Sequence, residues 1–278
     1  MKKTHLKLGW LWLVIASVVA PLHVQAEHEG KLQILLLGDS TTEGIIPRKT
    51  NPEGPHLEEV IRILLAAEKD LPPCNVINVG RSGEYVRGLL DGARYDRDVA
   101  KHPGLDYVFI RYGINDHNKR EEFEANYVKD YQELIARLRK DHPQATLVVT
   151  TVIPYMDEAT SAKINALNRE VAEKEKLPLF DLYPRYAEEL KKQGPNALNY
   201  RRFPQEQIPE DRQELVKSFL VKHGDTERVV VMDNQLDAHF AHLPSWFGDR
   251  HPNLAGYHVI GDETAKWLAK SIREKAKK

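Results

Sequence analysis

The sequence predicts an α/β fold, a three-layer α/β/α sandwich around a central parallel sheet of about five strands. Apolar runs of five to eight residues alternate along the chain with longer segments of helical periodicity. This alternation is typical of parallel strands joined by crossover helices. The composition, with 41% hydrophobic and 29% charged residues, lies in the range of globular proteins.

The first predicted strand covers residues 31–37, which read KLQILLL. Such a nearly continuous apolar run is typical of a strand that is buried on both faces. The other predicted strands are residues 75–79, 106–110, 146–153 and 177–181. Ligands of open parallel sheets bind beyond the carboxyl ends of the strands. We therefore expect Ser40, Gly83 and Asn115, which follow the first three strands, to lie close together.

Helical periodicity predicts helices over residues 57–69, 121–140, 161–174 and 253–275. Residues 184–245 break this alternation and are rich in proline, with one further helix expected over 210–222. A segment of this length without regular structure is usually either functional or disordered. We predict a single domain over residues 27–278, with a loop-rich insertion at about 184–245 packed beside the ligand-binding end.

The first 26 residues are expected to be a signal peptide. Three lysines precede an apolar run over residues 8–20, and Val24-Gln25-Ala26 offers a small-residue cleavage site. The alternative is an uncleaved membrane anchor. The apolar run of residues 8–20 is too short for this, because a helix needs roughly 20 residues to span a bilayer. We therefore predict a secreted or periplasmic protein with no stable membrane insertion after cleavage. The net charge of −1 does not favour a nucleic-acid partner.

Ser40 is the candidate nucleophile, because Gly38-Asp39-Ser40 forms a tight turn at the end of the first strand. A serine at such a turn can equally be a helix N-cap. A serine hydroxyl needs a base, and His251, at the start of the last helix, is the candidate. Asp249 is close enough in sequence to orient its ring. Backbone N–H groups at Ser40 and Gly83 and the Asn115 amide are suitable donors to an oxyanion, although both later segments can also be plain turns.

Four segments in this order resemble the blocks of the SGNH subgroup of the GDSL hydrolases. They are Gly38-Asp39-Ser40, Gly83, Gly113-Ile114-Asn115-Asp116 and His251-Pro252-Asn253. The resemblance spans residues 31–275. It implies an ester hydrolase with Ser40 as nucleophile, His251 as base, an oxyanion hole at Ser40, Gly83 and Asn115, and no cofactor or metal.

One position departs from the family pattern, which places an aspartate three residues before the histidine. That position is Gly248 here, and Asp249 lies two residues before His251. We expect Asp249 to complete the triad. Asp237 or Asp233 could supply the carboxylate instead, or the site could work as a Ser–His dyad.

Three further residues are candidate substrate contacts. Arg81 and Arg111 lie at strand ends and could hold an acidic group, although internal ion pairs are at least as plausible. Trp246, five residues before His251, could stack on a sugar ring of the substrate, or it could simply pack inside the protein. Asp237, His239 and His242 have a spacing compatible with a metal site, which His251 could join as a further ligand. We favour the serine site, which already accounts for His251.

The expected substrate is a small-molecule or polysaccharide ester, and the expected activity is removal of short acyl groups, above all O-acetyl groups on carbohydrate. A lipid esterase, a lysophospholipase or a thioesterase of the same family is the alternative. A non-catalytic glycan-binding protein on the same fold is the alternative from a different class. The oligomeric state does not follow from the sequence.

Overall fold

The computed structural model describes residues 30–223 and 226–277. The expected signal peptide, residues 1–26, lies outside these ranges. Within them, no helix has the length and apolar character needed to cross a bilayer.

The central sheet has five strands, all paired in parallel. They are β1 (Leu32–Gly38), β2 (Cys74–Asn78), β3 (Tyr107–Arg111), β4 (Thr146–Thr150) and β5 (Leu179–Phe180). The predicted strands are confirmed, although β4 ends at Thr150 and not at residue 153.

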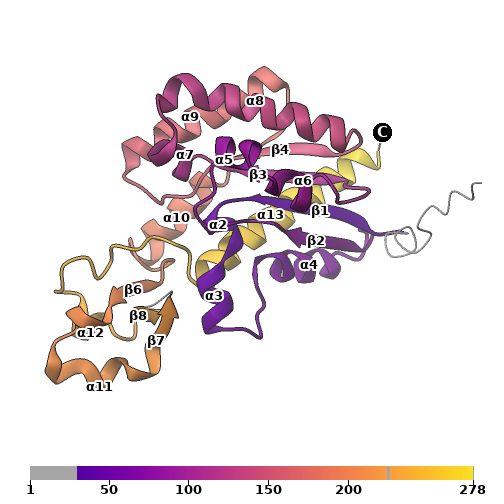
Figure 1. The fold of residues 1–278 in the computed structure, drawn as a ribbon. Helices are drawn as coiled ribbons and strands as arrows, with labels where there is room; N and C mark the ends of the chain where they lie inside the picture. The colour runs from indigo at the N-terminus through magenta and orange to yellow at the C-terminus, as the bar shows by residue number, and fades with distance from the viewer. Residues whose placement is uncertain (1–29, 224–225, 278) are drawn as a thin grey trace, which may run out of the picture.

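Helices cover both faces of this sheet, so the predicted three-layer sandwich is confirmed (Figure 1). One face packs against α5 (Val86–Asp91), α6 (Arg94–Asp98), α7 (Ile114–Lys119), α8 (Phe123–Asp141) and α9 (Glu158–Glu175). The other packs against α4 (Leu57–Ala67), α10 (Tyr183–Gln193) and α13 (Leu254–Lys275). The side chains of β1 alternate between the two cores: Leu35 and Leu37 enter one, and Ile34 and Leu36 enter the other.

The strand order β2-β1-β3-β4-β5 reverses direction at β1, because the chain first adds β2 on one side and then β3 on the other. Such a switch point opens a crevice at the carboxyl ends of β1 and β3. The turn after β1 leads into the short helices α2 (Ser40–Glu43) and α3 (Ile45–Thr50), and the turn after β3 leads into α7.

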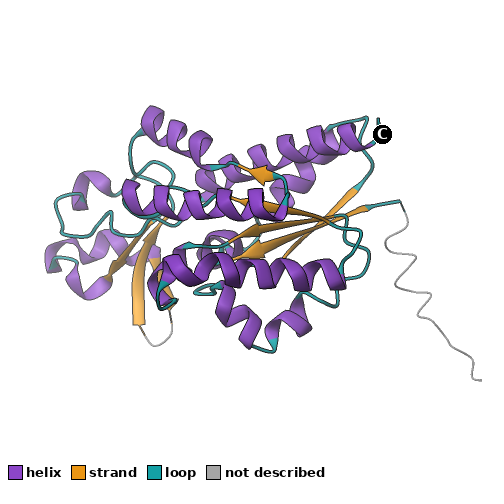
Figure 2. Ribbon diagram, turned by 90° about the horizontal axis from the view of Figure 1, so that it is seen from above, coloured by secondary structure: helices purple, strands orange, loops and turns teal. Residues whose placement is uncertain are grey.

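A smaller antiparallel sheet, of order β6-β8-β7, lies at one end of the sandwich (Figures 1 and 2). Its strands are β6 (Arg201–Pro204), β7 (Leu220–His223) and β8 (Thr226–Val231). Around it lie η1 (Gln205–Gln207), η2 (Glu210–Arg212), α11 (Gln213–Val216), η3 (Lys217–Phe219) and α12 (Asp237–Phe240). Its own core includes Phe203, Val229, Val231, Phe240 and Trp246.

The predicted helix over residues 210–222 is wrong. The chain there forms η2, the four-residue helix α11 and η3, and then enters β7, whose residues pair with β8. The run of valines at residues 229–231 is the second half of β8, the central strand of this sheet, so tertiary pairing outweighs local helical periodicity. The expected insertion boundary at residue 184 also falls inside α10, whose Tyr186 is buried in the main core beside α13.

Candidate active site

The turn after β1 presents Ser40 at the first position of α2. Asp39 caps this helix, since its Oδ1 accepts hydrogen bonds from Thr41 N at 2.9 Å and Thr41 Oγ1 at 2.8 Å. A Cβ atom at Gly38 would lie 2.8 Å from the Arg111 carbonyl oxygen, so the turn needs glycine there. Ser40 therefore sits on a firmly held turn with its side chain partly exposed.

His251 links Ser40 to Asp249. Ser40 Oγ lies 2.8 Å from His251 Nε2, and Asp249 Oδ1 lies 2.6 Å from His251 Nδ1. The same Asp249 oxygen accepts the backbone N–H of His251 at 3.0 Å, which a carboxylate two residues before the histidine can reach. The carboxylate fixes the hydrogen on Nδ1, so Nε2 is left to accept the proton of Ser40.

Arg202 of β6 holds the other oxygen of the same carboxylate. Its Nε lies 2.7 Å from Asp249 Oδ2, and the Asp249 side chain is only 6% exposed. Burial alone raises the pKa of Asp249, but the hydrogen bond from His251 and the nearby guanidinium of Arg202 outweigh it. The pKa of this carboxyl is therefore lowered, and Asp249 is ionised at neutral pH.

Two tyrosines enclose the imidazole of His251. Tyr200 stacks on the ring with an interplanar angle of 9° and a centroid distance of 5.8 Å. Tyr155 approaches edge-on at 4.9 Å, and its hydroxyl lies 3.2 Å from Nδ1. The backbone N–H of Tyr200 also donates to the His251 carbonyl at 3.2 Å, so the strand that enters the small sheet is tied to the base.

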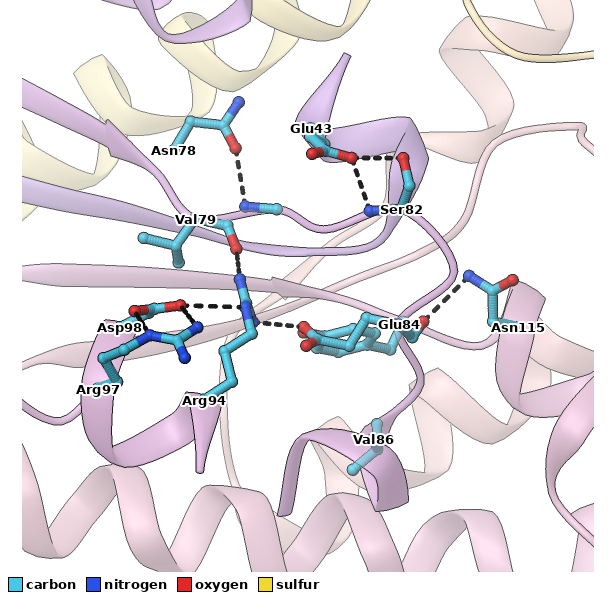
Figure 3. Close-up of polar contacts among 12 residues, drawn as sticks. Glu43, Asn78, Val79, Ser82, Glu84, Val86, Arg94, Arg97, Asp98 and Asn115 are labelled. Carbon is cyan, nitrogen blue, oxygen red and sulfur yellow. Dashed lines mark hydrogen bonds and ion pairs between the residues drawn. The ribbon is translucent and has the colours of Figure 1, made fainter. Parts of the chain in front are cut away.

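The loop after β2 carries Gly83, and Figure 3 shows the contacts that hold this loop. Glu43 Oε2 accepts Ser82 N at 2.6 Å, which fastens the loop to α2. Asn115 Nδ2 donates to the Glu84 carbonyl at 3.0 Å, and Lys119 Nζ donates to the Gly83 carbonyl. The φ of Gly83 is +76°, a conformation that favours glycine.

Asp116 joins the loop after β2 to the turn after β3. Its Oδ1 accepts Val86 N at 2.8 Å and its Oδ2 accepts Gly113 N at 3.0 Å. Burial raises the pKa of Asp116 to about 7. The three segments that carry Ser40, Gly83 and Asn115 are thus cross-linked by polar contacts, of which those of Asp116 are buried and that of Glu43 with Ser82 is exposed.

A cavity of about 240 Å³ opens over Ser40. Its wall contains both expected oxyanion positions, Gly83 and Asn115, together with His251. The backbone N–H groups of Ser40 and Gly83 make no hydrogen bond within the described part of the chain. Free N–H donors beside a serine–histidine pair suit the stabilisation of a tetrahedral oxyanion.

Two of the three expected substrate contacts do not fit their positions in the structure. Arg111 is 5% exposed, and its guanidinium donates to the Thr41 carbonyl at 2.6 Å, inside the turn below Ser40. Trp246 is fully buried in the core of the small sheet, and its Nε1 donates to Asp237 Oδ1 at 2.8 Å. Both side chains are buried and make hydrogen bonds inside the protein. The sequence alone does not distinguish such internal contacts from contacts with a ligand. Arg81 is exposed and lines a different cavity, whose wall also includes Ser82 and Gly83.

The two alternative carboxylates for the triad, Asp237 and Asp233, bind other groups. Asp237 is held by Arg201 through two contacts of 2.9 and 2.5 Å, and Asp233 accepts the backbone N–H of Gln235 at 3.0 Å. In residues 30–223 and 226–277, no three histidine, cysteine or acidic side chains are grouped to hold a metal ion. Asp237, His239 and His242 therefore do not form the metal site that their spacing allows.

Sequence reasoning missed four further side chains that line the cavity over Ser40: Tyr155, Tyr200, Arg202 and Tyr257. None belongs to a motif block. Tyr155 follows β4 at the carboxyl edge of the sheet, where a ligand-facing residue is expected. Tyr200 and Arg202 come from the segment that was expected to be loop-rich, and only its tertiary pairing brings them to His251.

The chain is similar to known hydrolases in sequence profile and in fold. The profile described as the GDSL-like lipase/acylhydrolase family matches residues 36–200. No curated protein is detectably similar to the chain in sequence.

Three solved structures illustrate the likeness in fold. The acetylxylan esterase Axe2 from Geobacillus stearothermophilus is 20% identical, with a TM-score of 0.54 over 85% of this chain and 94% of that one. The α/β hydrolase LAE5 from the metagenome of Lake Arreo, Spain, is 23% identical, with a TM-score of 0.53 over 84% and 94%. A protein from Parabacteroides merdae described as a GDSL-like lipase is 16% identical, with a TM-score of 0.54 over 86% and 97%.

Proposed function

Because this chain belongs to the GDSL-like lipase/acylhydrolase family and is a serine ester hydrolase, we propose that it removes short acyl groups, above all O-acetyl groups, from carbohydrate. The observation that carries the catalytic part is the unbroken series of contacts from Ser40 through His251 to Asp249, at 2.8 and 2.6 Å. The substrate part rests on the character of the cavity over Ser40.

In the proposed reaction, Ser40 Oγ attacks the acyl carbon while His251 Nε2 takes the serine proton. The carbonyl electrons move to the oxygen, and the N–H groups of Ser40 and Gly83 and the Asn115 amide stabilise the resulting oxyanion. The intermediate collapses, the C–O bond breaks, and the alcohol leaves with the proton from His251. Water then attacks the acyl-serine by the same route and releases the acid.

The polar cavity favours carbohydrate as the substrate. Three tyrosines and Arg202 contribute hydroxyl, aromatic and guanidinium groups to its wall. An apolar cavity under Thr42, between the sheet and α4 and α13, measures only about 20 Å³, about one water molecule and too small for an acyl chain. The similar fold of an acetylxylan esterase agrees with this proposal.

One observation favours the lipid alternative. Ile45, Ile46 and Pro47 of α3 contribute an apolar wall to the cavity over Ser40. The length of the acyl chain that this wall accepts distinguishes a carbohydrate acetylesterase from a lipid esterase. Hydrolysis of a thioester with the same acyl group tests the thioesterase alternative.

We expect activity on p-nitrophenyl esters to fall with acyl length, with acetate best, butyrate weaker and octanoate almost inert. A channel that buried the chain would gain about 0.8 kcal/mol per methylene, or about fourfold in kcat/KM per added carbon. The measurement is kcat/KM from acetate to laurate at one pH. A maximum at octanoate or beyond would replace the carbohydrate proposal with the lipid one.

We also propose that the chain is exported and cleaved after Ala26, which would bring the enzyme to extracellular or periplasmic polysaccharide. The N-terminal residue of the protein isolated from its cells tests this. Glu27 is expected, and Met1 or Lys2 would contradict it.

A further inference from the structure

A second cavity, of about 620 Å³, adjoins the cavity over Ser40. The two share Tyr155 and Arg202 in their walls. The rest of the second wall comes from the small sheet and from the segment that leads to His251; these residues are Pro204, Gln207, Arg228, Ser245, Gly248 and Asp249.

Strand register places two arginines on one face of the small sheet. Pro204 pairs with Arg228 across β6 and β8, and Arg202 lies two residues before Pro204 on the same strand. Residues at this spacing share a face, so the guanidinium groups of Arg202 and Arg228 both face the cavity. The opposite face of the sheet, with Phe203, Val229 and Val231, is buried in its core.

The cavity has an excess of positive charge. In residues 30–223 and 226–277, Asp249 is the only carboxylate that lines it, and His251 and Arg202 Nε already bind this carboxylate. Among the described residues, no partner is bonded to the terminal nitrogens of Arg202 or to the side chain of Arg228. Two arginines with free donors suit a planar anion such as a carboxylate.

The positions of the two cavities relative to the catalytic residues indicate which part of the ester carries the anion. Of these two cavities, Gly83 and Asn115 line the one over Ser40 and not the second, whereas Gly248 and Asp249 line the second and not the first. In ester hydrolysis the acyl oxygen faces the oxyanion donors, and the alcohol oxygen faces the Nε2 that returns the proton. The alcohol part of the ester therefore extends past His251 toward Arg202.

From this geometry we propose that the second cavity binds a carboxylate on the alcohol part of the substrate, and that the substrate is an O-acylated acidic glycan containing uronic acid. The proposal rests on the proposed esterase function and names its substrate class. Arg228 is a specificity residue that contacts the glycan, whereas Arg202 also holds Asp249 and so affects the reaction itself.

The test compares three substrates in the parent and in Arg228→Ala: acetylated polygalacturonate, acetylated xylan free of uronic acid, and p-nitrophenyl acetate. For the acidic glycan we expect kcat/KM to fall about tenfold, mainly through KM, because one charge-assisted contact is lost. Activity on the two neutral esters should not change. Arg228→Lys keeps the charge and should recover most of the loss.

Arg212→Ala is the matched control, because Arg212 lies near the small sheet but lines neither cavity. It removes the same charge and should leave all three rates unchanged. An equal loss on acetylated xylan in Arg228→Ala, or no loss on the acidic glycan, would overturn the proposal.

Binding of unacetylated trigalacturonate, measured by calorimetry, separates this proposal from the catalytic one. We expect the parent to bind it about tenfold more tightly than Arg228→Ala does, and added salt to weaken the binding. If the parent hydrolyses no ester but still shows this difference, the esterase proposal fails and the anion site stands. Equal binding by parent and variant would overturn the anion site even in an active esterase.

Discussion

Replacement of Ser40 by alanine should lower kcat/KM for p-nitrophenyl acetate by roughly 10³-fold or more. The substitution removes the oxygen that forms the acyl-enzyme bond and leaves the turn intact, because Asp39 caps α2 through Thr41 and not through Ser40. Far-UV circular dichroism and the melting temperature should stay at the parent values.

The matched variant is Ser82→Ala. Ser82 lines the same cavity and belongs to the loop that carries Gly83. Its hydroxyl donates to Glu43 and not to His251. It should lose far less activity than Ser40→Ala. Parent-level hydrolysis by Ser40→Ala would contradict the mechanism and would favour a different nucleophile.

Asp249→Asn should lower kcat by up to about 10⁴-fold, as loss of the orienting carboxylate does in serine proteases. The amide keeps the shape of the side chain but removes the charge beside His251 and can hold the wrong tautomer of the ring. It also leaves the guanidinium of Arg202 without the carboxylate oxygen at 2.7 Å.

Asp237→Asn is the informative comparison, because Asp237 holds the small sheet together through Arg201 and Trp246. We expect it to lower the free energy of unfolding in urea by about 1–3 kcal/mol while kcat changes little. If Asp237→Asn abolishes kcat instead, that residue is the triad acid. If neither variant affects kcat, the site works as a Ser–His dyad.

The main sheet could be predicted because its signals are local. A run such as KLQILLL indicates a buried strand without knowledge of its neighbours, and the glycine turns that follow mark the carboxyl edge. The meeting of Ser40 with His251 across 211 positions followed from the order of the motif blocks. Its proximity in sequence favours Asp249 as the triad acid, and in the structure Asp249 Oδ1 lies 2.6 Å from His251 Nδ1.

The small sheet and its contacts could not be predicted in the same way. Residues 210–222 carry a weak helical pattern, and only the pairing of β7 with β8 resolves it. Arg202 looks like an ordinary surface arginine until β6 brings it to Asp249. The sequence does not show whether an aromatic residue a few positions from the base, such as Trp246, faces a ligand or the hydrophobic core.

The direct test of the central claim is to react the protein with a fluorophosphonate, which phosphonylates an activated serine with loss of fluoride, and to locate the adduct by mass spectrometry. We predict one adduct per chain, on Ser40 in the tryptic peptide 32–48, and none in Ser40→Ala or His251→Ala. An adduct on another residue, or no adduct in a protein that hydrolyses p-nitrophenyl acetate, would contradict Ser40 as the nucleophile.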